Sequence, residues 1–397
     1  TTAIAADTLL DDVVVSVNRA EQKSFDAPAA IQAINKDVIQ DVGPQVNISE
    51  SLNRVPGVVA LNRQNYGQDL QISIRGFGAR TQFGVRGVRL ITDGIPATIP
   101  DGQGQSSTIS LTSAERIEVL RGPLAQLYGN AAGGVIQVFT KDASVNPELL
   151  LQGYLGSYGL KRSDIQYSEK LGKFGIVVDY STFRTDGFRN NSQAERNQFN
   201  GKFVYQHDDQ TKLSLIANVF DQPYAYDAAG LTTVAEGLAT PTKSLNPASY
   251  RDRKSVDQRQ FGLVLTHNVD SVTQINFRIY DGSRKVLAYT GSNLLPVGQT
   301  AADPKWQAID RDFSGIGFDY GTKTKLSDKD VFWKIGGNLD ISKEINQQGV
   351  ASNGEKSTTN TTLNFNKDQS AKNKDVFAQG NIFLGDRFSL LGGARVT

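Results

Sequence analysis

From about residue 150 onward, hydrophobic and polar residues alternate with a period of two in several separate segments. The alternation covers residues 176–180, 213–219, 275–279 and 333–339, where Ile, Leu, Val, Phe or Trp side chains recur at every second position. Because successive side chains of a strand point to opposite faces, each segment is predicted to be a β-strand with one apolar face. Alternation alone fits both a soluble β-sandwich and a barrel with an apolar outer surface and a wet interior.

The lengths of the connections favour the barrel. Tight links at residues 207–211 and 268–271 alternate with long polar stretches around 222–256, 284–310 and 341–372. Short turns on one rim and long loops on the other are typical of outer-membrane barrels. We expect about ten antiparallel strands between residues 148 and 384 and an eleventh that begins at Ser389. The sequence has no apolar run of the eighteen or so residues that a membrane helix needs.

The first 140 residues follow a different pattern, which predicts a compact α+β domain. Residues 25–42 suggest a strand and then a helix, a second helix begins at Ser49 and ends at Pro56-Gly57, and residues 70–74 form a strand. Residues 115–141 read as a strand, an Arg-Gly-Pro turn, a helical turn and a second strand. Glycines at 129, 133 and 134 permit backbone angles or close approaches that side chains would prevent. The composition changes near residues 145–147.

Composition excludes several classes of function. The 42 Lys and Arg residues balance 41 Asp and Glu residues, which gives no sign of a nucleic-acid partner. The absence of cysteine removes disulfide, thiolate-metal and thiol-nucleophile chemistry, and both histidines lie beside predicted turns. No catalytic motif with the required spacing is present, so an enzyme is not expected, and neither is a cofactor or a metal site. The small-residue spacing of Ala3-Ile4-Ala5 favours an exported protein.

The stretch ERIEVLRGPLAQLYGNAAGGVIQVFTK (115–141) resembles the end of the plug domain of TonB-dependent outer-membrane receptors. SIRGFG (73–78), LITDGIPATIPDGQGQ (90–105) and VLRGP (119–123) match further signatures of that family. The resemblance implies a periplasmic segment at 1–20, a plug at 21–142 and part of a transmembrane β-barrel at 146–397.

The family's complete barrel has twenty-two strands. Ten or eleven strands cannot enclose a plug of some 140 residues, so we expect the chain to be the N-terminal portion of a longer receptor. The resemblance also implies a monomer in outer-membrane lipid that is energised by TonB with ExbB and ExbD.

The segment LLDDVVVSVNR resembles the TonB box. An extended segment with unpaired backbone groups can be captured by strand addition to a partner's sheet, so that a pull on it transmits force. We assign the box to Asp12, Val13, Val14, Val15 and Ser16. The alternative is a first structural strand of the plug.

Two arginines, Arg75 and Arg121, match residues that latch the plug in this family by pairing with glutamates. Buried arginines need such partners, because an unpaired buried charge is costly. The local carboxylate candidates are Glu115 and Glu118, and further partners on the barrel are expected beyond residue 397. A purely structural ion pair is equally consistent with these residues.

The ligand is expected to meet the plug apices and long external loops. Arginines interspersed with aromatic residues suit a flat anionic ligand, through bidentate and cation–π contacts. The plug resembles most closely a receptor for pyrroloquinoline quinone, which is planar and tricarboxylic. A ferric-siderophore receptor is the alternative within the family, and a porin or adhesive barrel without energised transport is the alternative outside it. The predicted ligand-binding residues are Arg63, Tyr66, Arg80, Phe83, Arg86, Arg251 and Arg253.

Overall fold

The structure is a computed structural model of the 397-residue chain. It describes residues 14–15, 22–23, 30–62, 64–81, 84–129, 131–229, 234–243, 252–290, 304–352, 355–385 and 388–397.

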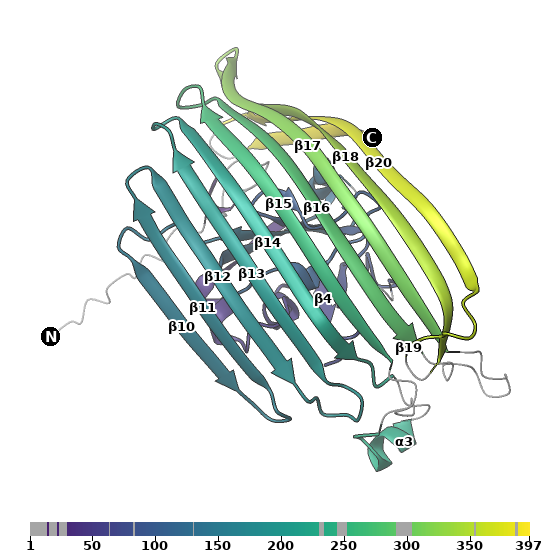
Figure 1. The fold of residues 1–397 in the computed structure, drawn as a ribbon. Helices are drawn as coiled ribbons and strands as arrows, with labels where there is room; N and C mark the ends of the chain where they lie inside the picture. Colours follow the sequence, from purple (N-terminus) through teal and green to yellow (C-terminus); the bar gives the residue numbers. More distant parts are fainter. Residues whose placement is uncertain are drawn as a thin grey trace.

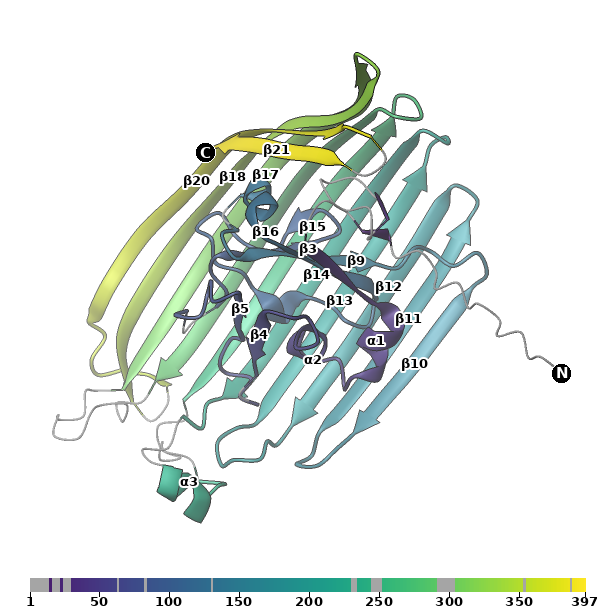
Figure 2. The same cartoon turned by 180° about the vertical axis from the view of Figure 1, so that it is seen from behind.

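A curved antiparallel sheet wraps around one side of a smaller α+β plug (Figures 1 and 2). Each strand of the sheet pairs with the next strand in sequence, from β10 to β21, and the short β19 (Glu355–Lys356) pairs with β18. The ten strands that end at Phe383 and the eleventh from Ser389 confirm the predicted number. The strands are β10 (Glu148–Leu155), β11 (Lys161–Leu171), β12 (Phe174–Thr185), β13 (Ala194–Gln206), β14 (Thr211–Tyr226), β15 (Arg253–Asn268), β16 (Gln274–Thr290), β17 (Lys305–Leu326), β18 (Lys329–Ser352), β20 (Leu363–Phe383) and β21 (Ser389–Val396).

The plug is built on a five-stranded sheet in the order β3-β8-β9-β6-β7, beside a two-stranded sheet of β4 and β5. Its core is an apolar cluster in which Ile39, Leu52, Ile74 and Ile117 are completely buried. The strand–helix and strand–turn–strand predictions are confirmed. The elements are β3 (Ala30–Asn35), α1 (Lys36–Asp41), α2 (Ser49–Leu52), β4 (Val58–Leu61), β5 (Gln71–Ile74), β6 (Val88–Thr92), β7 (Ile95–Pro96), η3 (Ser106–Thr108), β8 (Ala114–Arg121), η4 (Pro123–Tyr128) and β9 (Gly134–Thr140).

Two tight turns in the plug depend on left-handed backbone. Arg75 and Gly76 have φ values of 51° and 86°, and Asp93 and Gly94 have values of 48° and 83°. Two successive positive φ angles match the turn that joins closely paired antiparallel strands, and glycine at the second position adopts them without strain. The Asp93-Gly94 turn reverses the chain between β6 and β7, so it begins the hairpin described below.

The outer face of the curved sheet carries the predicted apolar side chains. Phe277 and Ile279 on β16 are 39% and 44% exposed, and the described residues place no second sheet over them. They pair across the sheet with Phe318 and Ile316 of β17, which are similarly exposed. A soluble sandwich would bury this face, so the structure favours the barrel.

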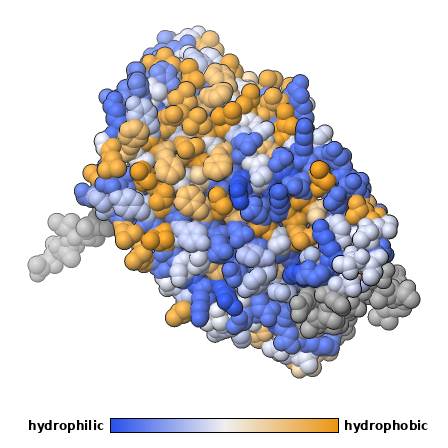
Figure 3. All heavy atoms as spheres, viewed as in Figure 1, coloured by the Kyte–Doolittle hydropathy of each residue, from blue (hydrophilic) through white to orange (hydrophobic). Residues whose placement is uncertain are grey.

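This apolar surface forms a belt over the half of the sheet nearest the short turns (Figure 3). Aromatic pairs mark its edge, with ring centroids 4.8 Å apart for Phe174 and Tyr205 and 5.4 Å apart for Tyr320 and Trp333. Rings at this level are the girdles of outer-membrane barrels. Toward α3 (Val234–Ala239) the outer surface becomes hydrophilic. The sheet thus has the outer surface that a transmembrane β-barrel presents to lipid.

The strands extend farther into the predicted long loops than the sequence indicated. β16 continues to Thr290, β17 begins at Lys305 and β18 continues to Ser352. In these extensions polar residues are common on both faces, apart from a small buried cluster of Tyr289, Trp306 and Ala351. The hydrophobic alternation is therefore weaker there, while the backbone ladder continues. The connections at this rim span 227–252, 291–304 and 353–362. No described helix is long and apolar enough to cross a membrane.

The belt predicts that a charge placed within it destabilises the protein. Phe277→Lys in the full-length protein is expected to lower the free energy of unfolding in lipid vesicles by up to about 2–4 kcal/mol. Ser283→Lys, which lies on the same outer face beyond the belt, is the matched control and should change it by less than about 1 kcal/mol. Denaturant titration of both variants measures the difference, and equal effects would contradict the placement of the belt.

Candidate functional site

The long connections identify the external rim, and the plug apex at 62–70 points toward it between β4 and β5 (Figure 2). Tyr66, which we expected in an exposed ligand pocket, is instead 9% exposed. Its ring lies 4.8 Å from that of Phe183, and the guanidinium of Arg196 lies 4.9 Å from its centroid. Tyr66 therefore packs in the seam between plug and sheet, because an apolar ring at the apex is stabilised by burial against the wall.

The apex is also tied to the first long external connection. Asp227 accepts hydrogen bonds from Asn65 Nδ2 at 2.6 Å, from Gln68 Nε2, and from the backbone N–H of Ala229 at 2.8 Å. One carboxylate thus joins two side chains of the plug to the start of the loop at 227–252. A change in that loop has a direct mechanical route to the plug.

The predicted ligand residues that the structure describes do not form one pocket. Arg80 and Arg86 are exposed at the plug, and Arg86 lies 3.7 Å from the carboxylate of Asp101. Arg63, Phe83 and Arg251 lie outside the described residues.

Arg253 is on the outer face of the wall, where its guanidinium pairs with Glu355 at 2.7 Å and lies 4.2 Å from the ring of Tyr289. The prediction that it lines the ligand pocket is therefore wrong. The cation that points inward is its neighbour Lys254, which is 3.1 Å from Asp69 of the plug. Although burial opposes it, Lys254 with Arg284 holds the pKa of Asp69 below its usual range.

The latch arginines lie beside each other rather than beside glutamates. Arg75 is exposed, and its backbone N–H donates to Gly57 O at 2.8 Å, while Arg121 donates a side-chain hydrogen bond to Pro56 O. Partial burial and the neighbouring Arg75 guanidinium lower the pKa of Arg121.

The expected local partners of these arginines are engaged or turned elsewhere. Glu118 is fully buried and bonds Arg116 at 2.7 Å, and Glu115 is exposed. The predicted burial and pairing are therefore wrong, because β8 places Arg121 at its end, beyond reach of these two carboxylates. A latch role for the arginines stays a prediction.

A different set of residues fixes the plug to the wall. Arg162 of β11 bonds Asp164 at 2.7 Å and Thr112 Oγ1 of the plug at 2.9 Å, and Gln166 donates to Thr112 O at 3.0 Å. All four side chains are buried. Sequence reasoning missed this cluster, although its signal was available: Arg162, Asp164 and Gln166 alternate along one face of β11, the face that must point into a barrel.

The neighbouring strands continue this seam. Ser110 Oγ donates to Asp179 on β12 at 2.8 Å, and both Gln198 and Asn218 donate to Thr108 O, at 2.7 and 2.9 Å. The plug segment 108–112 is therefore anchored by bonds from four consecutive strands.

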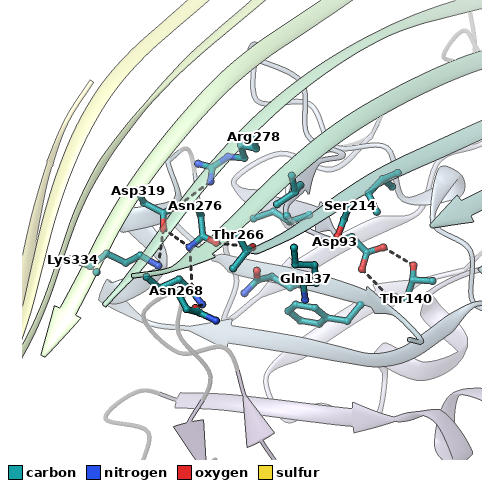
Figure 4. A pocket seen from close by; sticks show the side chains of 18 of the residues that line it. Asp93, Gln137, Thr140, Ser214, Thr266, Asn268, Asn276, Arg278, Asp319 and Lys334 are labelled. Atoms are coloured by element: carbon teal, nitrogen blue, oxygen red, sulfur yellow. Dashed lines mark hydrogen bonds and ion pairs between the residues drawn. The ribbon is translucent and has the colours of Figure 1, made fainter. Parts of the chain in front are cut away.

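A polar chamber of about 890 Å³ separates the plug from the wall on the other side of this seam (Figure 4). Asp93 and Thr140 line its plug side, and Lys334 pairs with Asp319 at 2.8 Å on the wall side. The chamber extends to turn residues Gln210 and Asp270 at the rim of short turns. No group of three or more potential metal-ligating His, Asp or Glu side chains occurs in the described part of the chain.

The assigned TonB box is described only in part. Val14 and Val15 form β1, which pairs antiparallel with β2 (Gln22–Lys23). Asp12, Val13 and Ser16 lie outside the described residues. The extended backbone fits both strand capture by a partner and the alternative of a structural strand.

Comparison with known proteins identifies the plug. Residues 23–135 match the TonB-dependent Receptor Plug Domain family. Residues 23–135 therefore form a plug domain of the TonB-dependent receptor family. The vitamin B12 transporter BtuB of Vibrio cholerae is 28% identical over 230 residues, which are 55% of this chain and 36% of the transporter. BtuB of Photobacterium profundum is 38% identical over 139 residues, which are 34% and 22% of the two chains.

Solved structures of two transport proteins share the fold over most of the chain. The unliganded ferric citrate transporter FecA superposes with a TM-score of 0.79 at 19% identity, covering 92% of this chain and 55% of FecA. The Pseudomonas aeruginosa receptor FpvA superposes with a TM-score of 0.77 at 14% identity, covering 96% and 53%. The chain thus spans about half the length of these receptors and about a third or less of the curated relatives' lengths.

The opposite orientations of Arg253 and Lys254 predict different effects of removing them. Lys254→Ala leaves Asp69 without its nearest cation and is expected to destabilise plug docking by roughly 1–3 kcal/mol. Arg253→Ala removes the ion pair with the exposed Glu355 and should destabilise plug docking by less than about 1 kcal/mol. Hydrogen exchange of residues 62–70 in the full receptor measures both, and a larger effect of Arg253→Ala would contradict the assigned faces.

Proposed function

We propose that the complete protein imports a scarce small anionic ligand across the outer membrane, energised by TonB with ExbB and ExbD. The family match of residues 23–135 is the observation that carries this proposal. A plug anchored inside the sheet blocks free diffusion, so passage needs work on the plug. An extended N-terminal strand such as β1 can transmit that work when a partner captures it.

The ligand is proposed to meet Arg80 and Arg86 on the exposed part of the plug, with pyrroloquinoline quinone as the first candidate. Each charge-assisted hydrogen bond to a carboxylate contributes roughly 1.5–3 kcal/mol before desolvation. Arg86 already pairs with one carboxylate, that of Asp101, so its side chain is oriented for another. Ferric siderophores can use the same arginines, and the fold shared with the ferric citrate transporter supports them as the second candidate.

Titration of the purified full-length receptor tests the ligand class. Pyrroloquinoline quinone, ferric citrate, a ferric catecholate and vitamin B12 should be compared under one salt concentration. Tight binding of the quinone alone supports the first candidate, and tight binding of a ferric complex supports the second. Preference for vitamin B12 would overturn an anionic ligand, because the arginine pair would then have no role in selection.

Removal of the proposed TonB box should separate binding from import. Deletion of residues 12–17 is expected to abolish energised uptake and leave ligand affinity within about twofold, because the ligand site is on the plug and not on this segment. Uptake of labelled ligand by cells with and without TonB supplies the measurement. Unchanged uptake after the deletion would favour a non-energised porin.

Charge reversal at the plug should weaken binding without unfolding it. Arg80→Glu or Arg86→Glu is expected to reduce affinity for the anionic ligand at least tenfold, equivalent to about 1.4 kcal/mol. Arg259→Glu is the matched control, because Arg259 is exposed on the outer face of β15. Calorimetric titration measures all three, and equal affinity in all of them would place the ligand site elsewhere.

A further inference from the structure

We propose that the plug hairpin at residues 95–104 is an ion-paired roof over the polar chamber, and that the chamber is a transit compartment open to the periplasm for the anionic ligand. The proposal rests on the importing role given above and adds a location for the gate. It divides the lumen into an external vestibule, a thin seal and a preformed space behind it.

The register of the wall strands shows these layers in order. On the inward face of β17, from the external rim, Arg311 precedes Phe313, two glycines follow, and Asp319 comes next. Arg311 contacts the hairpin tip, Phe313 belongs to an apolar cluster, and Asp319 lines the chamber. On the inward face of β16, Tyr280 of the same cluster likewise precedes Arg278 of the chamber. Two strands therefore pass through the same layers in the same order.

The apolar cluster is the seal. Ile95 and Ile99 of the hairpin are 4% and 5% exposed and pack with Ile216, Tyr280 and Phe313 of the wall. At Gly262 on β15 a Cβ atom would come within 2.5 Å of Ile95 Cγ1. The missing side chain at 262 thus makes the space that Ile95 fills. Pro96 of the hairpin and Gly94, immediately before it, line the chamber.

Charges hold the external end of the hairpin. The carboxylate of Asp101, at the hairpin tip, lies 3.7 Å from both Arg86 and Arg311. Arg311 is also held by Glu344 of β18. The Arg86 side chain is 52% exposed and that of Asp101 is 30% exposed. An arriving carboxylate can therefore compete with Asp101 for Arg86, which weakens the attachment of the hairpin where the ligand is proposed to bind.

The remaining attachments of the hairpin to the wall are weak compared with the main seam. Gln260 Nε2 donates to Pro96 O at 2.8 Å, and Asn373 Nδ2 donates to Pro100 O at 2.7 Å. Arg311 also donates to Gln103 Oε1, at a long 3.4 Å. The two neutral hydrogen bonds each contribute less than the charged contacts at Thr112. The hairpin can separate from the wall while the segment 108–112 stays anchored. A volume near 890 Å³ is adequate for a ligand of drug-like size.

Cysteine labelling tests the roof, because the 397 residues contain no cysteine. Thr266→Cys on β15 places a thiol in the chamber. A maleimide conjugate too large for porins should label the full-length receptor in cells with a permeabilised outer membrane, where the reagent reaches the periplasmic side. In intact cells, where it reaches only the outside, it should not label the receptor. Labelling from outside, or failure to label from the periplasm, would overturn the chamber assignment. This readout requires neither ligand nor uptake.

The ion pair is tested in the same background. Asp101→Asn keeps the size of the side chain and removes its charge, so external labelling of Thr266→Cys should rise at least tenfold. Asp257→Asn is the matched control, because Asp257 pairs with Arg259 at 3.7 Å on the outer face of β15, outside the chamber. Arg86→Gln, at an exposed position, is the second variant should Asp101→Asn fail to fold. Equal labelling in the folded variants and the control would overturn the ion-paired roof.

A reversible lock separates failure of this inference from failure of the proposed function. The double variant Ile95→Cys and Gly262→Cys joins the hairpin to the wall where the two residues touch. When oxidised it should bind ligand normally and import none, and reduction should restore uptake. Uptake in the oxidised form would overturn the gate while leaving the importer intact. If the unlocked wild-type receptor imports no ligand, the proposed function is overturned. The labelling of Thr266→Cys would still test the chamber assignment, because it does not depend on uptake.

Discussion

The structure depends on one constraint, which is that the two faces of a membrane-embedded sheet require opposite kinds of side chain: apolar toward lipid and polar toward the interior. Where Phe277 and Ile279 face lipid, their neighbours on β16 must face inward, and inward neighbours of a wet barrel are polar. Polar groups removed from water require partners, or each costs free energy. The plug supplies many of those partners, and it does so largely with backbone carbonyls. Thr108 O alone receives the amide groups of Gln198 and Asn218.

This demand explains why the plug is held unevenly. Along 108–112, Arg162, Asp164 and Asp179 of the wall form hydrogen bonds with hydroxyl groups of the plug, and neighbouring wall amides donate to its backbone carbonyls. Behind the hairpin the wall residues satisfy one another instead, as Asp319 does with Arg278 and Lys334. Groups that are paired within the wall do not need the plug, so the space between can remain wet. The tightly bonded seam at 108–112 and the open chamber both follow from the requirement that polar groups removed from water have partners.

Sequence alone predicts the strands, because a periodic pattern repeats the same preference over many residues. It fails where a shift of one position decides which face of the sheet a side chain occupies. The alternation of residues 275–279 located a lipid-facing strand correctly, because many residues share one preference. Arg253 and Lys254 differ only in which face they occupy, and the loop before them gives no pattern from which to count. Tyr66 looked like an exposed aromatic residue because the wall that covers it comes from strands more than a hundred residues away. Such long-range burial has no local signal in one sequence.

The arginine pair at the plug shows a different limit, which is electrostatic. Arg75 was expected to be buried with a carboxylate, yet the two-residue turn at 75–76 holds it in left-handed backbone at the surface. It lies beside Arg121, whose buried Nε has no hydrogen-bond partner among the described residues. Two guanidinium groups in proximity repel each other, and the repulsion is strongest where water is excluded. A carboxylate between them would gain attraction from both and satisfy the buried Nε. Arg75 and Arg121 therefore remain able to bind a carboxylate, as the latch prediction requires, but that carboxylate is neither Glu115 nor Glu118.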